Sequence, residues 1–570
     1  MVQSARAGDA PIRAVQPVAE YFVPFDANPR DHRPAGQLEW VTHLGTDFGP
    51  LGPGRDKLVW RDGRACADLR GGGSAGLWHS LAGLARDADA TLDFTRCYPP
   101  WIAADRQPRC TGVSVRVNGH GPFALEIQAA DRHVLWSWRE TIDTAGADRE
   151  YTVDCPPGQL RAAKFLNWVA GPDAEVAVDR LALRLEFPPM PFPDRVFLIS
   201  YAKLSRCYDP RAGIVKNRAH WPTGRFEALP ATGLFTLATA AAWTRGVVDR
   251  QFAEAALHAI HHTVSTLPRA DGWLPHYVSH DAAGHYAVHP GTEFSTIDTS
   301  LYYHGTILAS QILGDGPMLA QLEREVRALR FDHLRTPDGW VLHGFRQDGH
   351  TPLRGAWNGW GGEAALVLLT ERMALGAGAP LKMAPGGVVH NGVGFIGEIQ
   401  SLFYPQFDQA RPAALAGADW RAARLALLAE QRAWFPAHEP DSAAAKVGVF
   451  GLSAGEALGG RGYVSNGTRK PTADVIHPHY ILMAGRWEPG ATYDLLRRME
   501  AKGLLPPWGL VENIRPDLAE YLPMLGSLDA AFEAVGSYHL WARFTGGADA
   551  IDAAARACPL TADAIRAFYP

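Results

Sequence analysis

The sequence predicts two parts, an N-terminal β-sandwich followed by an (α/α)6 toroid. The first observation is length, because 570 residues exceed what one ordinary hydrophobic core accommodates. The second is a change of hydrophobic period near residue 190, from strict alternation to a spacing of about 3.6 residues. The third is the proline-rich segment at that boundary, PPMPFPD (188–194). We therefore expect domains at 1–190 and 196–570.

Alternation in the first part predicts short strands joined by Gly and Pro turns. Residues 113–117 and 123–127 place an apolar side chain at every second position. Asn118-Gly119 lies between them, and this dipeptide favours a two-residue hairpin turn. Residues 176–187 alternate in the same way. Several such strands between about 20 and 187 are typical of a sandwich.

The second part carries helical periodicity in many separate stretches. Proline density predicts a stiff linker over 188–194. Helices are then predicted at 231–246, 249–267, 295–314, 317–332, 362–376, 393–403, 418–434, 473–485, 490–502, 527–545 and 547–556. Roughly a dozen helices separated by loops rich in Gly, Trp and His suggest paired helices. An (α/α)6 toroid, with six inner helices around a funnel, satisfies this pattern.

Composition excludes several classes of protein. Net charge is −5 and no long basic run occurs, which argues against nucleic-acid binding. The sequence contains no apolar stretch of about 18 residues, which is the length needed to predict a membrane span. The first 15 residues lack the apolar core of a secretory signal, so we expect a cytoplasmic protein, or a periplasmic or secreted one if the N-terminus was trimmed. The spacing of the six cysteines matches no zinc pattern, and we expect neither metal nor cofactor.

Four acidic residues recur where a loop rich in Gly or Trp meets a predicted helix: Asp298, Glu363, Glu456 and Glu512. Glycosidic hydrolysis needs two carboxyl groups with pKa values driven apart, one to protonate the leaving oxygen and one to activate water or attack carbon. Three of them have a simpler interpretation. Asp298 could form a capping box with Ser295, Glu363 could complement a helix dipole, and Glu512 could form an ion pair.

Tryptophan and histidine favour a sugar-binding cleft. Many of the 18 Trp residues stand beside Gly or Pro, as in WNGWGG and PPWG, and Trp in turns often lines a cleft. His477 and His479 flank a proline, which predicts an extended segment with the two side chains on opposite faces. We therefore expect no metal shared by this pair.

The helical part resembles the glucoamylase-like domain family, which includes bacterial endo-β-1,2-glucanases and the transglycosylating domain of cyclic β-1,2-glucan synthases. The similarity runs from about 197 to 545 and opens with LISYAKLSRCYDPRAGIVKNRAHWP, similar to the family's first helix. EFSTIDTSLYYHG and WGGEAALVLL resemble two helix starts at the family's funnel. EIQSLFYPQFD resembles a Gln-Tyr-Pro stretch preceding an Asp. GLSAGEALGGRGY and WGLVEN resemble two further segments, with Glu456 and Glu512 where the family has Asp.

The resemblance implies an (α/α)6 fold and acid-catalysed chemistry on glucans. We expect a glycoside hydrolase or transglycosylase acting on a glucan, with β-1,2-glucan the first guess. Glu363 is the expected general acid and Glu456 the base or nucleophile, while Asp298 and Glu512 hold hydroxyls or tune the acid. The expected stacking faces are Trp357, Trp360, Tyr463 and Trp508, and the expected polar contacts are His343, Arg346, Asp348, His477 and His479.

Two alternatives stay open at this point. A polysaccharide lyase could use Tyr302, Tyr303 and His304, which follow Asp298, although a lyase on uronic acids should show a basic cleft. A non-catalytic glycan-binding protein could retain the fold without turnover. A saccharide is the expected partner in each case.

Overall fold

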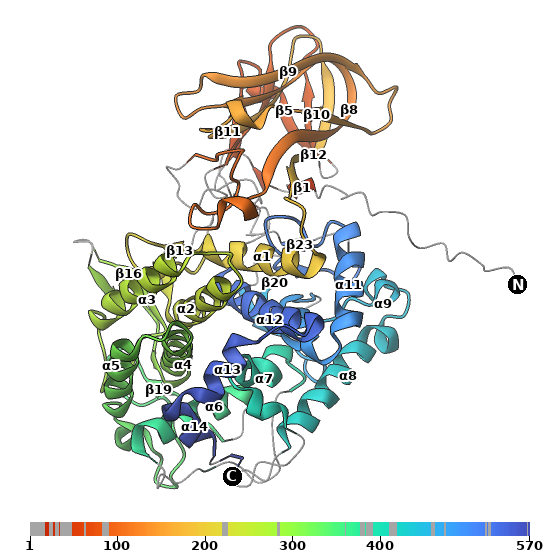
Figure 1. Cartoon of the computed structure of the whole chain (residues 1–570). Helices are drawn as coiled ribbons and strands as arrows, with labels where there is room; N and C mark the ends of the chain where they lie inside the picture. The colour runs from red at the N-terminus through yellow and green to blue at the C-terminus, as the bar shows by residue number, and fades with distance from the viewer. Residues whose placement is uncertain are drawn as a thin grey trace, which may run out of the picture.

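The computed structural model combines a β-rich N-terminal part with a helical C-terminal part (Figure 1). None of the helices it describes is both long and apolar enough to span a bilayer. The structure describes residues 18–21, 27–28, 33–34, 48–61, 64–81, 91–218, 226–281, 285–358, 361–376, 382, 391–409, 419–457, 462–471, 475–518, 521–522, 526–566 and 568–569.

The β-rich part is built around one antiparallel sheet centred on β8 (Arg109–Gln128). The first half of β8 lies between β12 (Glu175–Glu186) and β10 (Arg149–Asp154), and its second half between β11 (Phe165–Ala170) and β9 (Val134–Asp143). The remaining strands are β1 (Val18–Tyr21), β4 (Phe48–Leu51), β5 (Leu58–Arg61), β6 (Arg64–Asp68) and β7 (Ala75–Ser80). Because β8 changes partners along its length, it joins two groups of strands.

The hairpin predicted at Asn118-Gly119 is wrong, because β8 continues through it. Gly119 and Gly121 adopt φ values of +130° and +110°, which bend the strand without reversing it. A Cβ atom on Gly119 would lie 2.0 Å from the Glu175 carbonyl oxygen, so only glycine allows this close strand pairing. The apolar residues on both sides of the bend are buried in one core, as expected for a single strand.

The strand predicted at 176–187 is confirmed as β12. Its apolar positions change parity between Val178 and Leu181, and the register with β8 shifts between Val178 and Arg180. A β-bulge accommodates the extra residue and keeps both apolar runs in the core.

Six helices of the second part are buried over most of their length: α2 (Leu229–Thr244), α4 (Thr296–Leu313), α6 (Gly361–Leu375), α7 (Gly394–Glu398), α10 (His479–Ala484) and α12 (Ser527–Thr545). Each contacts the next in this order, and α12 contacts α2, so the contacts form a closed circuit. The predicted helices near these positions are confirmed, although the ordered helix near 473–485 begins only at His479.

Outer helices cover the circuit with one buried face each: α3 (Arg250–Ser265), α5 (Gly316–Arg327), α8 (Trp420–His438), α11 (Pro489–Ala501) and α13 (Ala550–Ala557). The hydrophobic period did not predict α1 (Phe192–Ser205), α9 (Ala443–Val447) or α14 (Pro559–Ile565). The predicted linker is shorter than expected, because α1 begins inside it. Pro193 occupies the first turn of α1, where a missing N–H costs nothing.

The two parts share one continuous buried core. The segment between β7 and β8 makes the junction: Trp101 stacks on Phe252 with ring centroids 5.0 Å apart, and the Tyr98 hydroxyl donates to the Pro507 carbonyl. The Arg206 guanidinium lies over the rings of Tyr98 and Trp508, 5.1 Å from each. The β-rich part therefore supports the loop that leads to Glu512.

Candidate functional site

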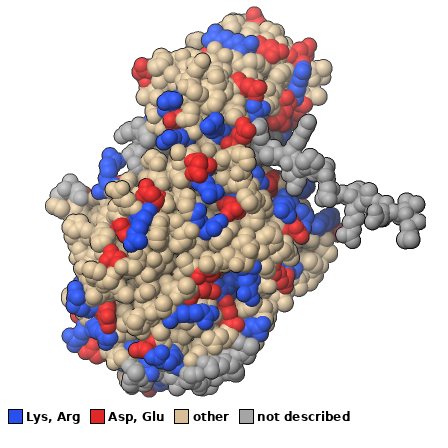
Figure 2. All heavy atoms as spheres, in the orientation of Figure 1, with Lys and Arg blue, Asp and Glu red and all other residues tan. Residues whose placement is uncertain are grey.

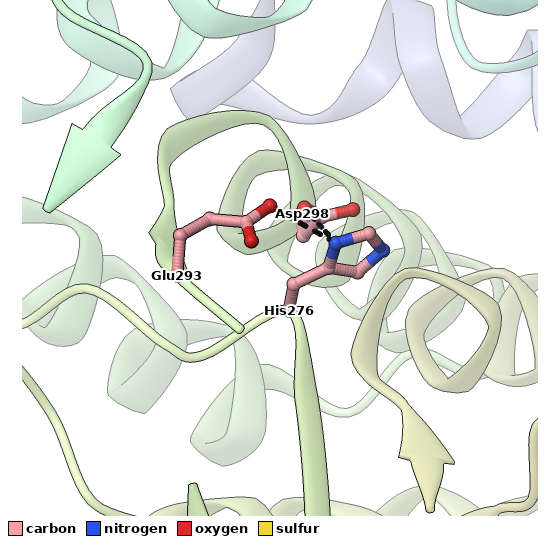
Figure 3. Close-up of side chains that lie close together, drawn as sticks. All are labelled: His276, Glu293 and Asp298. Carbon is pink, nitrogen blue, oxygen red and sulfur yellow. Dashed lines mark hydrogen bonds and ion pairs between the residues drawn. The ribbon is translucent and has the colours of Figure 1, made fainter. Parts of the chain in front are cut away.

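Acidic side chains and histidines from the beginnings of several buried helices meet in one region. The first group is His276, Glu293 and Asp298, which lie close together before and within the first turn of α4 (Figure 3). His276 Nδ1 lies 3.1 Å from Glu293 Oε1 and 3.6 Å from Asp298 Oδ2. One imidazole nitrogen thus faces two carboxylates.

The pKa values of this group follow from burial and mutual attraction. Burial lowers the pKa of His276, but the Asp298 and Glu293 carboxylates more than offset this and raise it above its ordinary value. Burial raises the pKa of Asp298, while the hydrogen bond from His276 lowers the pKa of Glu293. The arrangement suits an imidazolium held between two carboxylates. The ligand atoms also lie within 4.8 Å of one another, a spacing that a metal ion could bridge.

Asp298 takes part in the helix cap only through its backbone N–H group, and not through its carboxylate. The Ser295 hydroxyl oxygen accepts the Asp298 N–H at 3.2 Å, as an N-cap should. The reciprocal bond of a capping box is not made, because the Ser295 N–H donates to the Leu274 carbonyl. The Asp298 carboxylate turns toward His276 instead, so the cap and the site coincide at this helix start.

Glu363 lies in the first turn of α6 and is half-buried. Its charge acts on both His276 and the phenol of Tyr463. The helix start is closely packed: a Cβ atom on Gly362 would lie 1.8 Å from the Gln400 amide oxygen. This close packing fixes the position of the backbone at Glu363.

A second acidic group lies around Asp529, in the first turn of α12. Asp529 Oδ2 lies 3.3 Å from His479 Nδ1. Lys203 of α1 is fully buried, with Nζ 2.7 Å from Glu533 Oε1 and 3.9 Å from Glu512 Oε2. Burial raises the pKa of Glu533 to about 7 despite this lysine. Glu512 is thus held in an internal ion network, as its simplest interpretation predicted.

The hairpin of β20 (Ala454–Ala457) and β21 (Gly462–Ser465) brings a further segment to this region. Glu456 pairs with Tyr463 across the hairpin. Gly455 touches the site from behind, because a Cβ atom there would lie 2.9 Å from Asp529 Oδ2 and 2.4 Å from His477 Cδ2. Tyr463 is 54% exposed, and its phenol interacts electrostatically with Asp529, Glu363 and Glu512. The side chain of Glu456 lies outside the described residues.

The structure contradicts the expected stacking role of Trp357 and Trp508, because both side chains are buried. Trp357 is 4% exposed and donates its indole N–H to the Thr296 hydroxyl at 2.8 Å, beneath α4. Trp508 is fully buried under Arg206. A buried ring offers no face to a sugar, so both serve the core. Trp360 lies outside the described residues, and of the other three only Tyr463 presents an exposed ring.

The expected geometry of His477 and His479 is also wrong. Pro478 adopts a helical conformation and opens α10, so the two imidazoles lie on neighbouring sides with centroids 6.2 Å apart. Both are buried, and His479 Nε2 contacts the Ser453 hydroxyl at 2.9 Å. They support Asp529 from within the protein and are not placed to contact a sugar directly.

The remaining predicted polar contacts flank β19 (Gly344–Phe345): His343 precedes this strand, and Arg346 and Asp348 follow it. Asp348 accepts hydrogen bonds from the His350 and Thr351 N–H groups and the Thr351 hydroxyl, so its carboxylate closes its own turn. Arg346 is exposed beside it. His343 is half-buried against Trp357, with ring centroids 4.3 Å apart. No described contact joins these three to the acidic groups.

The residues expected for a lyase are buried inside α4. Tyr302, Tyr303 and His304 are fully buried. The Tyr404 hydroxyl and the Leu366 carbonyl occupy the two ring nitrogens of His304. The trio cannot meet a substrate, so this alternative loses the residues on which it rested.

Sequence reasoning missed four residues of the site: His276, Glu293, Asp529 and Lys203. Glu293 stands two residues before the Ser295 cap, and Asp529 repeats the pattern of an acidic residue in a first helical turn. The same rule that selected Asp298 could have found both. Lys203 is a charge inside an apolar helix, which is itself a signal.

Comparison with solved structures places this chain among proteins of one fold. It is similar to a glucoamylase candidate from Bacteroides caccae, at 15% identity and a TM-score of 0.55 over 66% of this chain and 98% of that one. It is also similar to an endo-β-1,2-glucanase from Chitinophaga pinensis in complex with sophorotriose and glucose. That match has 14% identity and a TM-score of 0.54, and it covers 66% of this chain and 98% of that one. The expected resemblance is thus confirmed at the level of fold.

A third similar structure includes the β-rich part. A β-1,2-glucanase from Parabacteroides distasonis matches at 11% identity and a TM-score of 0.55 over 90% of this chain and 93% of that one. No model of a known protein family and no curated protein matches the sequence.

Proposed function

From the fold that this chain shares with β-1,2-glucanases, we propose that it is a glycoside hydrolase or transglycosylase acting on a glucan, with β-1,2-linked glucan as the first substrate to test. The closed circuit of buried helices supports an (α/α)6 toroid over 196–570, and the two groups of strands joined by β8 support a sandwich over 1–190. The observation that carries the proposal is the set of acidic residues in the first turns of α4, α6 and α12, with the hairpin of Glu456 packed against Asp529.

In this proposal Glu363 protonates the leaving oxygen. It is half-buried and therefore open to substrate, whereas Asp529 and Glu512 are 2% and 3% exposed. Glu456, on the strand that lies against Asp529, serves as general base or nucleophile. The exposed ring of Tyr463 stacks on a sugar. Protons and water suffice for this chemistry, so the proposal requires no cofactor.

The group around His276 would bind sugar hydroxyls next to the acid. Glu293 and His276 keep 35% and 23% of their side-chain surface exposed, so both can contact substrate. The Glu363 carboxylate acts on this group in turn, because its charge helps to raise the pKa of His276.

The test compares Glu363→Gln with the wild type on β-1,2-glucan and on a panel of glucans of other defined linkages. Loss of acid catalysis should lower kcat/KM at least a hundredfold while leaving oligosaccharide binding within about twofold. Glu323→Gln, on the outer helix α5 with 40% of its side-chain surface exposed, is the matched control and should keep full activity. NMR of the first-formed anomer distinguishes inverting from retaining action.

Two outcomes contradict the proposal. Retained activity in Glu363→Gln removes that residue from the role of acid. Binding of glucan by calorimetry, without product from any substrate of the panel, identifies a non-catalytic glycan-binding protein.

A further inference from the structure

A cavity lies at the opposite end of the helical circuit from the acidic groups. Its lining includes the end of α12, the turn after α10 and the beginning of α13, and its volume is about 500 Å³. Asp529 stands at one end of α12 and Arg543 near the other, roughly 20 Å apart at 1.5 Å per residue. The cavity is therefore separate from the proposed catalytic site, and its size falls within the range of small-molecule sites.

The lining is unusually rich in arginine. Arg421, Arg486, Arg543 and Arg556 all face the cavity. Arg486 is paired with Asp408, and its Nη1 lies 3.9 Å from Asp552 Oδ1. The other three arginines form no ion pair with any residue in the described part of the chain. Arg543 and Arg556 act on the Asp552 carboxylate at longer range, but guanidinium groups that outnumber the carboxylates of one hollow repel one another unless a further anion joins them.

A buried histidine adds to the positive charge. His539 Nδ1 lies 2.6 Å from Asp549 Oδ2, and its Nε2 lies 3.0 Å from the Leu402 carbonyl oxygen. Because both partners are acceptors, both ring nitrogens must carry a proton, and the ring is an imidazolium. His539, Asp549 and Asp552 have the spacing of a metal site, but a doubly protonated ring has no lone pair to offer a metal.

The charges of the lining leave a positive excess. Four arginines and the His539 imidazolium face Asp408, Asp549 and Asp552, so the cavity carries a net charge of two positive. The face drawn in Figure 2 shows acidic and basic side chains interspersed, with no continuous field of one sign.

We propose that this cavity binds a phosphoryl group, either as free phosphate or as a small phosphate ester. A phosphoryl dianion matches the net charge, and its oxygens suit the planar fork of guanidinium groups. The Trp487 ring, which lies 5.8 Å from the Arg421 guanidinium, would cover the organic part of an ester. This inference is independent of the proposed glycosidase activity.

The experiment is calorimetric titration of the full chain with inorganic phosphate and with glucose 1-phosphate, at constant ionic strength set with chloride. Each of Arg421→Ala and Arg556→Ala should weaken binding about tenfold or more, the loss expected for one charge-assisted hydrogen bond. Arg161→Ala, an exposed arginine of the β-rich part, is the matched control and should bind as the wild type does. Thermal unfolding confirms that each variant is folded.

The two ligands separate the possible sources of the phosphoryl group. Tighter binding of glucose 1-phosphate supports a phosphate ester, and equal binding supports the free anion. The proposal is overturned if neither ligand produces heat beyond that of chloride, or if Arg421→Ala and Arg556→Ala both bind as tightly as Arg161→Ala.

Discussion

At the scale of single residues, Lys203 holds the acidic side of the candidate site together. Its ammonium group is fully buried between Glu533 and Glu512. Lys203→Met would leave these carboxylates without their cation, and we expect a loss of about 3–5 kcal/mol in the free energy of unfolding, measured by urea denaturation. Lys502→Met, at an exposed position, should change it by less than about 0.5 kcal/mol.

A double variant separates the charge from the shape of the lysine. Lys203→Met with Glu533→Gln should recover part of the loss, because one uncompensated carboxylate is removed as well. If Lys203→Met lowers the free energy of unfolding no more than Lys502→Met does, the buried ion pair of Lys203 with Glu533 does not have this stabilising role.

At the scale of elements, the β20–β21 hairpin reaches the site because residue 455 has no side chain. A Cβ atom there would meet His477 and Asp529, whereas one on Gly490 of α11 meets nothing within 4 Å. We expect Gly455→Ala to cost about 1–3 kcal/mol in the free energy of unfolding and to lower turnover on glucan, because it shifts the strand that carries Glu456.

Gly490→Ala is the matched control, and it should be neutral or stabilising by up to about 1 kcal/mol. Full activity and full stability of Gly455→Ala would show that the hairpin tolerates a side chain there, contrary to this packing.

At the scale of the whole molecule, stability should fall on the alkaline side. The Asp549 and Asp552 carboxylates outweigh burial and raise the pKa of His539 to about 9. A raised pKa in the folded state contributes stability that is complete below pH 6.5 and is lost as pH rises through 9. His539→Gln should therefore cost roughly 3 kcal/mol at pH 6 and almost nothing near pH 10, by urea unfolding.

His285→Gln removes an exposed histidine and should cost the same at both pH values. A cost for His539→Gln that is constant from pH 6 to pH 10 contradicts the buried ion pair.

Local signals in the sequence predicted a good part of this molecule. The change of period near residue 190, most helix positions and the Ser295 cap all follow from neighbours within a few residues. The placement of Asp298 and Glu363 in first helical turns is local as well. The turn at Asn118-Gly119 failed although its signal is local, because pairing with the distant Glu175 holds the strand open.

The sequence by itself determined the kinds of element, their order and which helix starts carry carboxylates, because periodicity and capping act within a turn or a strand. The tertiary structure decided that Trp357 and Trp508 are buried, that Asp298 meets His276, and that Asp529 stands against the hairpin of Glu456. These outcomes depend on contacts between segments far apart in the chain, and no local pattern encodes which buried surfaces will meet.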